Sequence, residues 1–554
     1  MDPGFDRWLT IGFERRVLVV VRTMTTLNRL LDVLTLFGGD HRVQTVFTFD
    51  RERPAILGAG VPGLLERLGA AVIPWRQAIT TEFDLAIAAS ENDDLHLLRA
   101  PVVLLPHGIG HQKYYPGSSV VAGLNPQRLV HEGRVVPALI AVAHAEQRDQ
   151  LHAASPEAAE RAEVVGDPCL DRLVAGAHRA AEYRTALAGR GKRLVTIAST
   201  WGPSSVLGQH PDLPLRLVAE LPVDTTAVCT ILHPGIAAAH SSWQLDAWLA
   251  EAKKAGLLVI PSETGWQTAI TASSCVIGDE SSVSLYAAAL DLPLLMAGSP
   301  SPATVPGSPA AMLAARATPL AADRPLAAQI DDAIDRHVPG SYEPVAKQAV
   351  AVPGQSAELL RAACYRLMNL PEPSTPAEFT SYPVNPAART EPVAFLAGIR
   401  EHGNTDVLVR LPATEVPQRL HHLHVLAHHT RASLRELSAA AIVFTDDAEL
   451  DFADWAPVVL KQWPDAQFAA LRLEDRCLAA DRSGRHYELT PASRQVDPLA
   501  AVSMLYLGRS ELDFGRQRVS CSDSSSLMYS FVRGCPSRHA SQISRPHAVR
   551  ADSS

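Results

Sequence analysis

Residues 193–199 read RLVTIAS, a short and mostly apolar run. A continuous apolar strand of this length is typical of a parallel sheet that is buried on both faces. Further runs of the same kind follow, with helical patterns such as 243–255 and 284–290 between them. These further runs lie at 226–232, 257–260, 275–278 and 292–296. The series predicts a doubly wound α/β domain.

The first 170 residues contain a second series of this kind. It begins with residues 16–22 (RVLVVVR), and helical spacing follows over 25–36. Later apolar runs lie at 42–49, 70–74, 83–89, 102–105, 138–143 and 162–165. The chain is therefore predicted to be α/β, with two tandem doubly wound, Rossmann-like domains.

Changes in pattern predict the domain limits. The two α/β domains are expected at 1–175 and 190–370, with a helix over 356–368 closing the second. Prolines at 371, 373 and 376 predict an exposed linker over 371–392, because proline cannot continue a helix. Residues 393–507 predict an accessory α+β domain of unknown role, and the Ser- and Arg-rich residues 508–554 a disordered tail. The candidate strands of the accessory domain are 405–411, 440–445 and 501–507.

Composition limits the class of protein. The chain has 554 residues, 47% of them hydrophobic, and a formal net charge of -9, which argues against a nucleic-acid partner. Its seven cysteines are scattered and never form C-x-x-C, so neither a zinc site nor a disulfide framework is expected. With no signal-peptide pattern and no apolar run of about 18 residues, a cytoplasmic location is expected.

Polar motifs follow three of the predicted strands. Ligands of open α/β sheets bind beyond the carboxyl ends of the strands. A histidine at such a position can have a purely structural role in a turn, and Asp or Ser can serve only to cap the next helix. The start of a helix nevertheless suits a phosphate, because its free amides and dipole attract anions. The motifs are His107-Gly108 after 102–105, His233-Pro234 after 226–232, and Asp279-Glu280-Ser281-Ser282 after 275–278.

In this order the motifs resemble those of the CDP-glycerol glycerophosphotransferases, which build teichoic-acid-type polymers on a GT-B fold. Residues 166–171 (GDPCLD) are similar to the family's G-x-P-x-x-D at the domain junction. Residues 198–201 (ASTW) are similar to its A-P-T-W. Residues 279–283 (DESSV) and 290–295 (LDLPLL) are similar to D-Y-S-S-V and L-x-x-P-I-I. The resemblance covers about residues 15–370.

Several positions depart from the family pattern. Glu280 stands where the family usually has Tyr, and Leu285 or Tyr286 where it has Asp. Leu292 stands where a basic residue is common, and residues 109–113 (IGHQK) replace T-P-L-K. Bacterial sialyltransferases share part of this signature through their His-Pro and Ser-Ser motifs. The departures therefore leave the identity of the donor open.

The resemblance implies an enzyme that transfers glycerophosphate, or a similar alditol phosphate, from a CDP-linked donor to an acceptor hydroxyl with release of CMP. The setting it implies is cell-wall or surface polymer synthesis, without a cofactor or metal. His107 would be the general base and His233 would contact the diphosphate. The phosphate site would comprise Ser281, Ser282 and Asp279, the last ordering the turn, and further nucleotide or acceptor contacts would be Gly108, Lys113 and Thr200.

Two alternatives are kept. The first is a nucleotide-sugar glycosyltransferase or epimerase on the same scaffold. The second is a degenerate domain that binds a nucleotide or a partner without turnover, with 393–507 as the interaction module. The family's acceptors are typically lipid-linked, which would place the chain peripherally at the inner face of the membrane, although no basic amphipathic helix is visible.

Two further patterns are expected to have no function. Residues 58–63 (GAGVPG) match G-x-G-x-x-G, but they follow a polar segment rather than a strand, so a loop that leads into a helix is expected. A histidine cluster is expected on a surface helix, where His424 and His428 would share one face. A metal site is not expected there because no third ligand can be named. The cluster comprises His421, His422, His424, His428 and His429.

Overall fold

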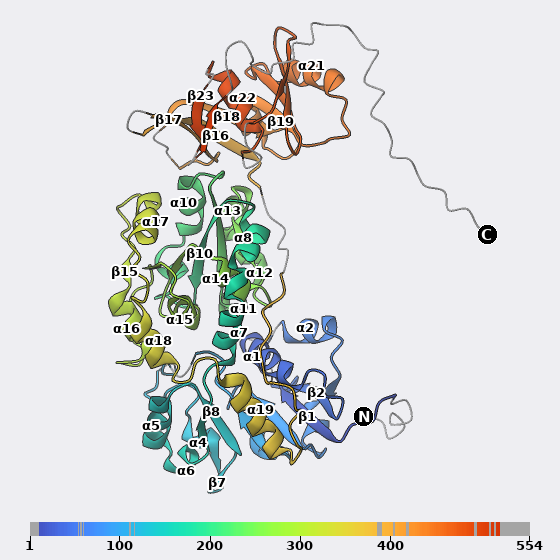
Figure 1. The fold of residues 1–554 in the computed structure, drawn as a ribbon, viewed down its shortest axis with the longest axis vertical. Coiled ribbons are helices and arrows are strands. Elements are labelled where there is room, and N and C mark those ends of the chain that lie inside the picture. Colours follow the sequence, from blue (N-terminus) through green and yellow to red (C-terminus); the bar gives the residue numbers. More distant parts are fainter. Residues whose placement is uncertain are drawn as a thin grey trace, which may run out of the picture. The chain divides into compact units, whose positions relative to one another are not determined.

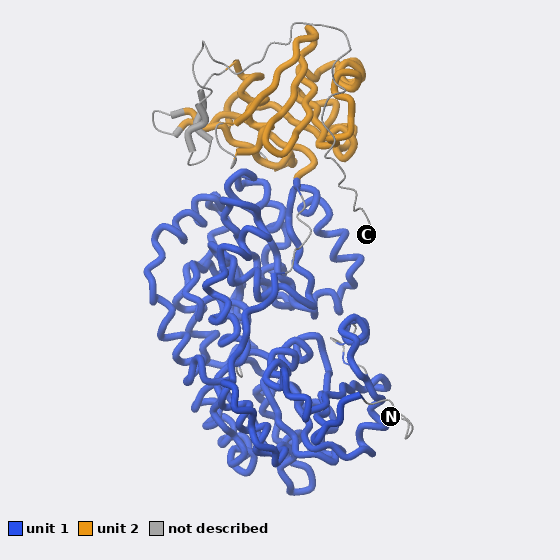
Figure 2. Tube along the Cα trace, turned by 45° about the vertical axis from the view of Figure 1, so that its right-hand side comes forward, with its two compact units in different colours: residues 1–391 blue, residues 392–554 orange. Residues whose placement is uncertain are grey.

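The computed structural model describes residues 10–384 and 391–508, with gaps at 54, 56–57, 59, 110–111, 116, 403–404, 417–419 and 492–495, and the strand residues 511–514 and 517–520. The chain forms two compact units, residues 1–391 and 392–554 (Figure 2). Unit 1 contains two parallel sheets, and unit 2 contains a mixed sheet (Figure 1).

The first sheet of unit 1 has seven parallel strands in the order β3-β2-β1-β4-β5-β8-β9. The chain order reverses between β1 and β4, and such a switch point leaves a crevice at the carboxyl ends of the strands. The strands are β1 (Arg15–Val20), β2 (Val43–Phe49), β3 (Val72–Pro74), β4 (Leu85–Ala88), β5 (Val102–Leu104), β8 (Leu139–Val142) and β9 (Ala162–Val164).

The second sheet repeats this plan with six parallel strands in the order β12-β11-β10-β13-β14-β15. Its switch point lies between β10 and β13. The prediction of two tandem doubly wound domains is thus confirmed. The strands are β10 (Arg193–Ser199), β11 (Thr226–Leu232), β12 (Leu258–Ile260), β13 (Cys275–Gly278), β14 (Leu294–Met296) and β15 (Thr318–Pro319).

Helix α19 (Ser356–Leu367) returns to the first domain. Its residues Leu360 and Cys364 belong to the same buried core as Val17 of β1. Figure 1 shows the helix beside β1. The prediction that residues 356–368 close the second domain is therefore wrong. Helical spacing identifies the buried face of a helix, but it does not say which core that face meets.

Residues 166–171 hold the start of this returning helix. The carboxylate of Asp171 accepts hydrogen bonds from the backbone N–H of Ser356 at 2.9 Å and from the Ser356 hydroxyl. Gly166 has φ +79, and a Cβ there would lie 3.0 Å from the Val352 carbonyl oxygen. Glycine is therefore required at the point where the chain leaves the first domain.

A buried ion pair joins the two domains of unit 1. Arg29, on α1 (Met24–Leu34) of the first domain, donates from Nη2 to Asp167 and to the Tyr286 hydroxyl, each at 2.8 Å. The Arg29 and Asp167 side chains are 3% and 1% exposed. Burial would lower the pKa of Arg29, but Asp167 and then Tyr286 raise it, and the net pKa lies well above its usual value. Tyr286 lies on α15 (Ser282–Ala289), which follows β13 of the second domain.

Residues 371–384 form an irregular, mostly exposed segment that is anchored to unit 1 at two buried aromatic side chains. Phe379 belongs to the core of the first domain, and Tyr382 belongs to the core of the second. The Tyr382 hydroxyl also donates to Asp32 of α1 at 2.9 Å. Exposure fits the prediction for most of this stretch, and Phe379 and Tyr382 are exceptions because their side chains are buried. Residues 385–390 lie outside the described residues.

Unit 2 is built on a mixed sheet with the strand order β22-β21-β20-β19-β18-β16-β17-β23-β24. Strands β18, β19 and β20 are parallel, with α20 (Leu434–Ser438) and α21 (Phe452–Gln462) in the connections between them. The strands are β16 (Ala394–His402), β17 (Thr405–Pro412), β18 (His421–His428), β19 (Ala440–Thr445), β20 (Phe468–Arg472), β21 (Cys477–Asp481), β22 (His486–Leu489), β23 (Glu511–Phe514) and β24 (Gln517–Ser520).

The histidine cluster lies on a strand, not on a surface helix. Strand β18 pairs with β16 and β19, so both of its edges are hydrogen-bonded within the sheet. At about 3.3 Å per residue, His424 and His428 are separated by roughly 13 Å, which is too far to share a metal ion. No group of three or more metal-ligating side chains occurs in the described part of the chain.

Two other predictions for unit 2 are corrected. Residues 501–507 were expected as a strand but lie mostly in helix α22 (Leu499–Tyr506), since a short apolar run fits a buried helix equally well. Strands β23 and β24 extend the sheet within the expected disordered tail, and residues from 521 onward lie outside the described residues. Among the described helices, none is long and apolar enough to cross a membrane.

Replacing Arg29 with Met is expected to destabilise unit 1 by about 3–5 kcal/mol, because Asp167 would be left as an unpaired buried charge. Tyr286→Phe serves as the matched control and should cost only about 1.5–3 kcal/mol, since it removes hydrogen bonds but no charge. Urea unfolding measures both. Equal losses in the two variants would contradict the ion pair as the main tie between the domains.

Candidate functional site

The carboxyl edges of the two sheets in unit 1 face each other. Gly108 follows β5 of the first sheet, and Ser282 begins α15 after β13 of the second. A Cβ added to Gly108 would lie 2.6 Å from Ser282 Oγ and 3.4 Å from Ser282 Cβ. Two motifs that are far apart in the sequence are therefore in direct contact, and glycine makes their close approach possible.

The loop that follows His107 is anchored on the second domain. Ile109 is fully buried in the core of that domain, and the Tyr114 N–H donates to the Ala303 carbonyl at 2.7 Å. Glu280 fixes the receiving loop from the other side, since its carboxylate accepts from the Ser301 N–H at 3.0 Å. The residue that departs from the family's Tyr thus supports this contact between the domains.

His233 caps helix α11 (Pro234–His240) at the end of β11. Its Nδ1 accepts the N–H of Gly235 at 3.0 Å, so a neutral ring carries its proton on Nε2. Burial, with smaller contributions from His107 and Lys113, lowers the pKa of His233 to about 4. At neutral pH His233 is therefore an uncharged hydrogen-bond donor.

Asp279 orders the loop that follows β10. Its Oδ2 accepts from the N–H groups of Thr200 at 2.8 Å and Val206 at 3.1 Å. The side chain is 1% exposed, and burial raises its pKa although both backbone hydrogen bonds lower it. Asp279 therefore ties the end of β13 to the loop after β10. The same loop carries Trp201, which is 50% exposed.

The first turn of α15 is suited to an anion. The Ser281 hydroxyl caps the helix by accepting from the Ser284 N–H at 3.4 Å, and Ser282 is the first helical residue. The free amides and dipole of such a turn attract negative charge. Lys113 interacts electrostatically with the carboxylates of Asp279 and Glu280. Burial lowers the pKa of Lys113 and the two carboxylates raise it, with a net lowering.

The His107 residue as a whole is exposed to solvent, although protein atoms surround its imidazole closely enough to desolvate it. This desolvation lowers its pKa, Glu91 raises it, and Arg29 lowers it, with a net lowering. The imidazole is therefore neutral near pH 7 and can accept a proton. It also lies near His233, whose pKa it affects.

The structure brings the candidate residues of the sequence together in one region of unit 1, although their roles stay predictions. The Thr200 N–H donates to Asp279, and Gly108 lies against Ser282. Lys113 interacts electrostatically with Asp279. The group comprises His107, Gly108, Lys113, Thr200, His233, Asp279, Ser281 and Ser282.

Sequence reasoning missed Glu91 and Arg29. Glu91 follows the apolar run at 83–89 as an acid after a strand, which is the same signal that identified His107. Arg29 lies within the amphipathic stretch 25–36, and a charged residue on the apolar face of a helix was the available clue.

No family model and no curated protein matches the sequence. Among solved structures, the wall teichoic acid polymerase TagF aligns with 64% of this chain and 89% of its own length, at 13% identity and a TM-score of 0.43. The UDP-GlcNAc 2-epimerase from Neisseria meningitidis, bound to UDP-GlcNAc, aligns with 63% of this chain and 100% of its own, at 12% identity and a TM-score of 0.41. HepE from Anabaena, in complex with UDP and glucose, aligns with 64% and 100%, at 13% identity and a TM-score of 0.37. Likeness at this level carries no argument about this chain.

Gly108→Ala is expected to destabilise unit 1 by about 1–3 kcal/mol, because the added methyl displaces the Ser282 hydroxyl. In a Ser282→Ala background the same change should cost less, with a coupling of at least about 0.5 kcal/mol. Urea unfolding of the four proteins measures the cycle. Additive effects would show that the two residues are not in contact.

His233→Asn is expected to keep the helix cap, whereas His233→Ala should lose about 1 kcal/mol. The pKa of His233 in the folded chain is below its unfolded value, so the unfolded state binds the proton first as the pH falls. Wild type should therefore lose more stability than His233→Asn between about pH 6.5 and pH 4. Urea unfolding at pH 7.5 and pH 5 tests this. An identical pH dependence in both proteins would contradict a His233 whose pKa is lowered in the folded chain.

Proposed function

We propose that this chain transfers glycerophosphate, or a similar alditol phosphate, from a CDP-linked donor to an acceptor hydroxyl and releases CMP. One observation carries the proposal. A neutral histidine after a strand of the first sheet lies beside a helix start in the second that is suited to phosphate, as the contact of Gly108 with Ser282 requires. A proton acceptor and an anion site are therefore adjacent. The motif order, which resembles that of the glycerophosphotransferases, supports the choice of donor.

The proposed reaction is a displacement at phosphorus. The acceptor oxygen forms a bond to the β-phosphorus, while the bond between that phosphorus and the bridging oxygen breaks. CMP leaves with the electron pair, and His107 takes the proton of the acceptor hydroxyl. Catalysis of this kind depends mainly on positioning and on stabilising oxyanion charge.

The second domain supplies that stabilisation in the proposal. The amides at the start of α15 and the hydroxyls of Ser281 and Ser282 bind phosphate oxygens. His233 donates one hydrogen bond from Nε2 to the diphosphate, as the neutral tautomer allows. Lys113 contributes the positive charge, since His233 with a pKa of about 4 does not.

A nucleotide-sugar donor is the second candidate. Glu280 stands where the family usually has Tyr, and its carboxylate accepts a hydrogen bond from the Ser301 N–H, so this part of the family pattern is changed here. A transferase or epimerase that uses a nucleotide sugar would employ the same phosphate subsite. Binding of nucleotide without turnover is the remaining outcome.

The acceptor and its setting belong to the same proposal. A hydroxyl on a lipid-linked polymer would place the enzyme peripherally at the inner face of a membrane, in cell-wall or surface polymer synthesis. The donor is separated from the alternatives by incubating the full chain with CDP-glycerol, other CDP-alcohols and UDP-sugars. CMP release that depends on an added hydroxyl acceptor supports the proposal, UDP release supports the second candidate, and binding without product contradicts both.

His107→Ala is expected to lower the rate of CMP release by about 10²–10⁴-fold, because the general base is lost. Donor affinity, measured by calorimetry, should change little, since His107 belongs to the first domain and the diphosphate binds the second. Ser281→Ala is the matched variant, and it should weaken donor binding by roughly tenfold to a hundredfold through loss of one hydrogen bond to a charged oxygen.

The pH profile provides the control for this assignment. The pKa of His107 lies below its ordinary value, so the wild-type rate should stay high on acidification past pH 6.5 and fall only at lower pH. The residual rate of His107→Ala should lack this acid limb. Normal turnover by the variant would rule out His107 as the base.

A further inference from the structure

Glu91 is a buried acid that the proposed reaction does not yet use. It follows β4, is 4% exposed, and accepts hydrogen bonds at Oε1 from the Gly123 N–H at 2.8 Å and from the Tyr115 hydroxyl. Burial, and then Glu91, raises the pKa of Tyr115 to about 12, so Tyr115 keeps its proton and donates. A carboxylate held by two donors is fixed in position.

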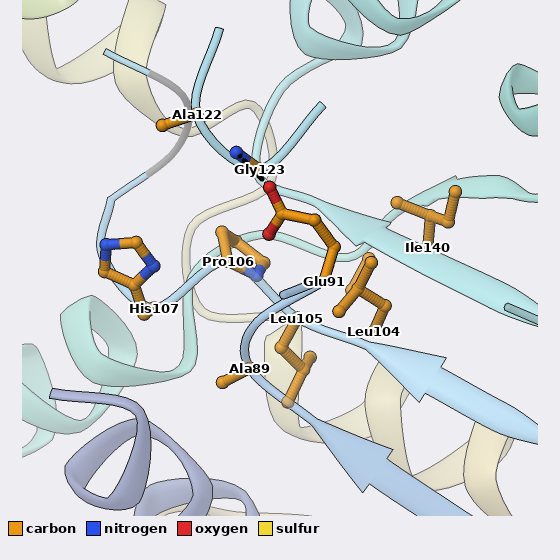
Figure 3. A pocket seen from close by; sticks show the side chains of 10 residues that line it. Ala89, Glu91, Leu104, Leu105, Pro106, His107, Ala122, Gly123 and Ile140 are labelled. Carbon is orange, nitrogen blue, oxygen red and sulfur yellow. Dashed lines mark hydrogen bonds between the residues drawn. The ribbon is translucent and has the colours of Figure 1, made fainter. Parts of the chain in front are cut away.

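Glu91 and His107 occupy equivalent positions after two neighbouring strands, three residues beyond the last residue of each. Strands β4 and β5 are parallel neighbours, and these two residues follow their carboxyl ends. Both side chains line one cavity of about 20 Å³, together with Pro106 and Gly123 (Figure 3). That volume is enough for one water molecule, and the Glu91 carboxylate and the His107 ring would be polar partners for it.

We propose that Glu91 is the positioning residue of His107, and that its charge stabilises the imidazolium that forms when His107 takes the acceptor's proton. This inference rests on the proposed function. No proton reaches Glu91 in this scheme, so the atom balance of the transfer is unchanged. A carboxylate beside an imidazole raises its basicity and favours its protonated state.

Among the described residues, Glu91, Arg29 and His233 interact electrostatically with His107. Glu91 after β4 raises the pKa of His107, and Arg29 of α1 lowers it. His233 after β11 is neutral at working pH because its pKa is about 4. Glu91 is therefore the one anion among the described groups that act on this imidazole. Its negative charge partly offsets the effects of burial and of Arg29.

A bracing role offers the competing explanation, because Glu91 also holds the segment from Tyr115 to Gly123. Glu91→Gln separates the two roles, since the amide oxygen can still accept from both donors while the charge is lost. Tyr115→Phe is the matched control, since it removes a brace and keeps the charge. Glu91→Asp keeps the charge on a shorter side chain and tests rescue.

The first measurement does not require activity. In the full chain with labelled histidine, the His107 signal is assigned by its loss in His107→Ala and then titrated by NMR. The His107 pKa should be lower in Glu91→Gln than in wild type, closer to wild type in Glu91→Asp, and unchanged in Tyr115→Phe. An unchanged His107 pKa in Glu91→Gln would overturn the inference, whether or not the chain proves to be a glycerophosphotransferase.

The second measurement is kinetic and uses CDP-glycerol as the donor. Glu91→Gln should lower kcat roughly tenfold or more, shift the acid limb of the pH profile to lower pH, and leave the donor KM within about twofold. Tyr115→Phe should lower the melting temperature while kcat stays near wild type. If CMP release is present but both variants lose kcat equally with the pH profile unmoved, Glu91 only braces the loop. If no donor is turned over, the proposed function fails, and the NMR titration alone decides the coupling.

Discussion

The ion pair between Arg29 and Asp167 is the constraint on which unit 1 depends. It is almost fully buried, and it holds α1 of the first domain against Tyr286 of the second. Two charges of opposite sign are tolerated there because each satisfies the other, and the loss of either leaves a costly unpaired charge. Since α15 carries Tyr286 in the turn after Ser282, the same tie fixes the start of α15 relative to the first domain.

This tie explains why the site can be precise although its parts come from distant segments. The chain crosses between the domains at Asp167, returns through α19, and is fastened there by Asp171. The loop after His107 then extends onto the second domain and buries Ile109 in its core. Several contacts thus hold the two domains of unit 1 together, and the motifs of His107 and Ser282 meet at Gly108. These contacts bring the His107 loop and the start of α15 together.

Much of this could be predicted from the sequence, because apolar strands and the polar residues after them follow a local rule. His107, His233 and Asp279 were found in this way, and so could Glu91 have been, as an acid after a strand. The incorrect predictions concern which core or which neighbouring strands a segment packs against. The spacing predicts a helix over 356–368 but not the core that this helix joins, and the prolines after 370 do not indicate that Phe379 and Tyr382 are buried. In unit 2 the histidine cluster falls on a strand because β16 and β19 form hydrogen bonds with this segment on both sides. A local sequence pattern does not identify such neighbouring strands.

We expect a nucleoside diphosphate to bind where the two domains of unit 1 meet. A crystal structure of the full chain grown with CDP tests it most directly. The diphosphate should lie at the start of α15, within hydrogen-bond distance of the Ser281 and Ser282 hydroxyls and of His233 Nε2, with the His107 ring facing the β-phosphate. Density for CDP at any other place, or a diphosphate that does not contact these groups, would contradict the claim.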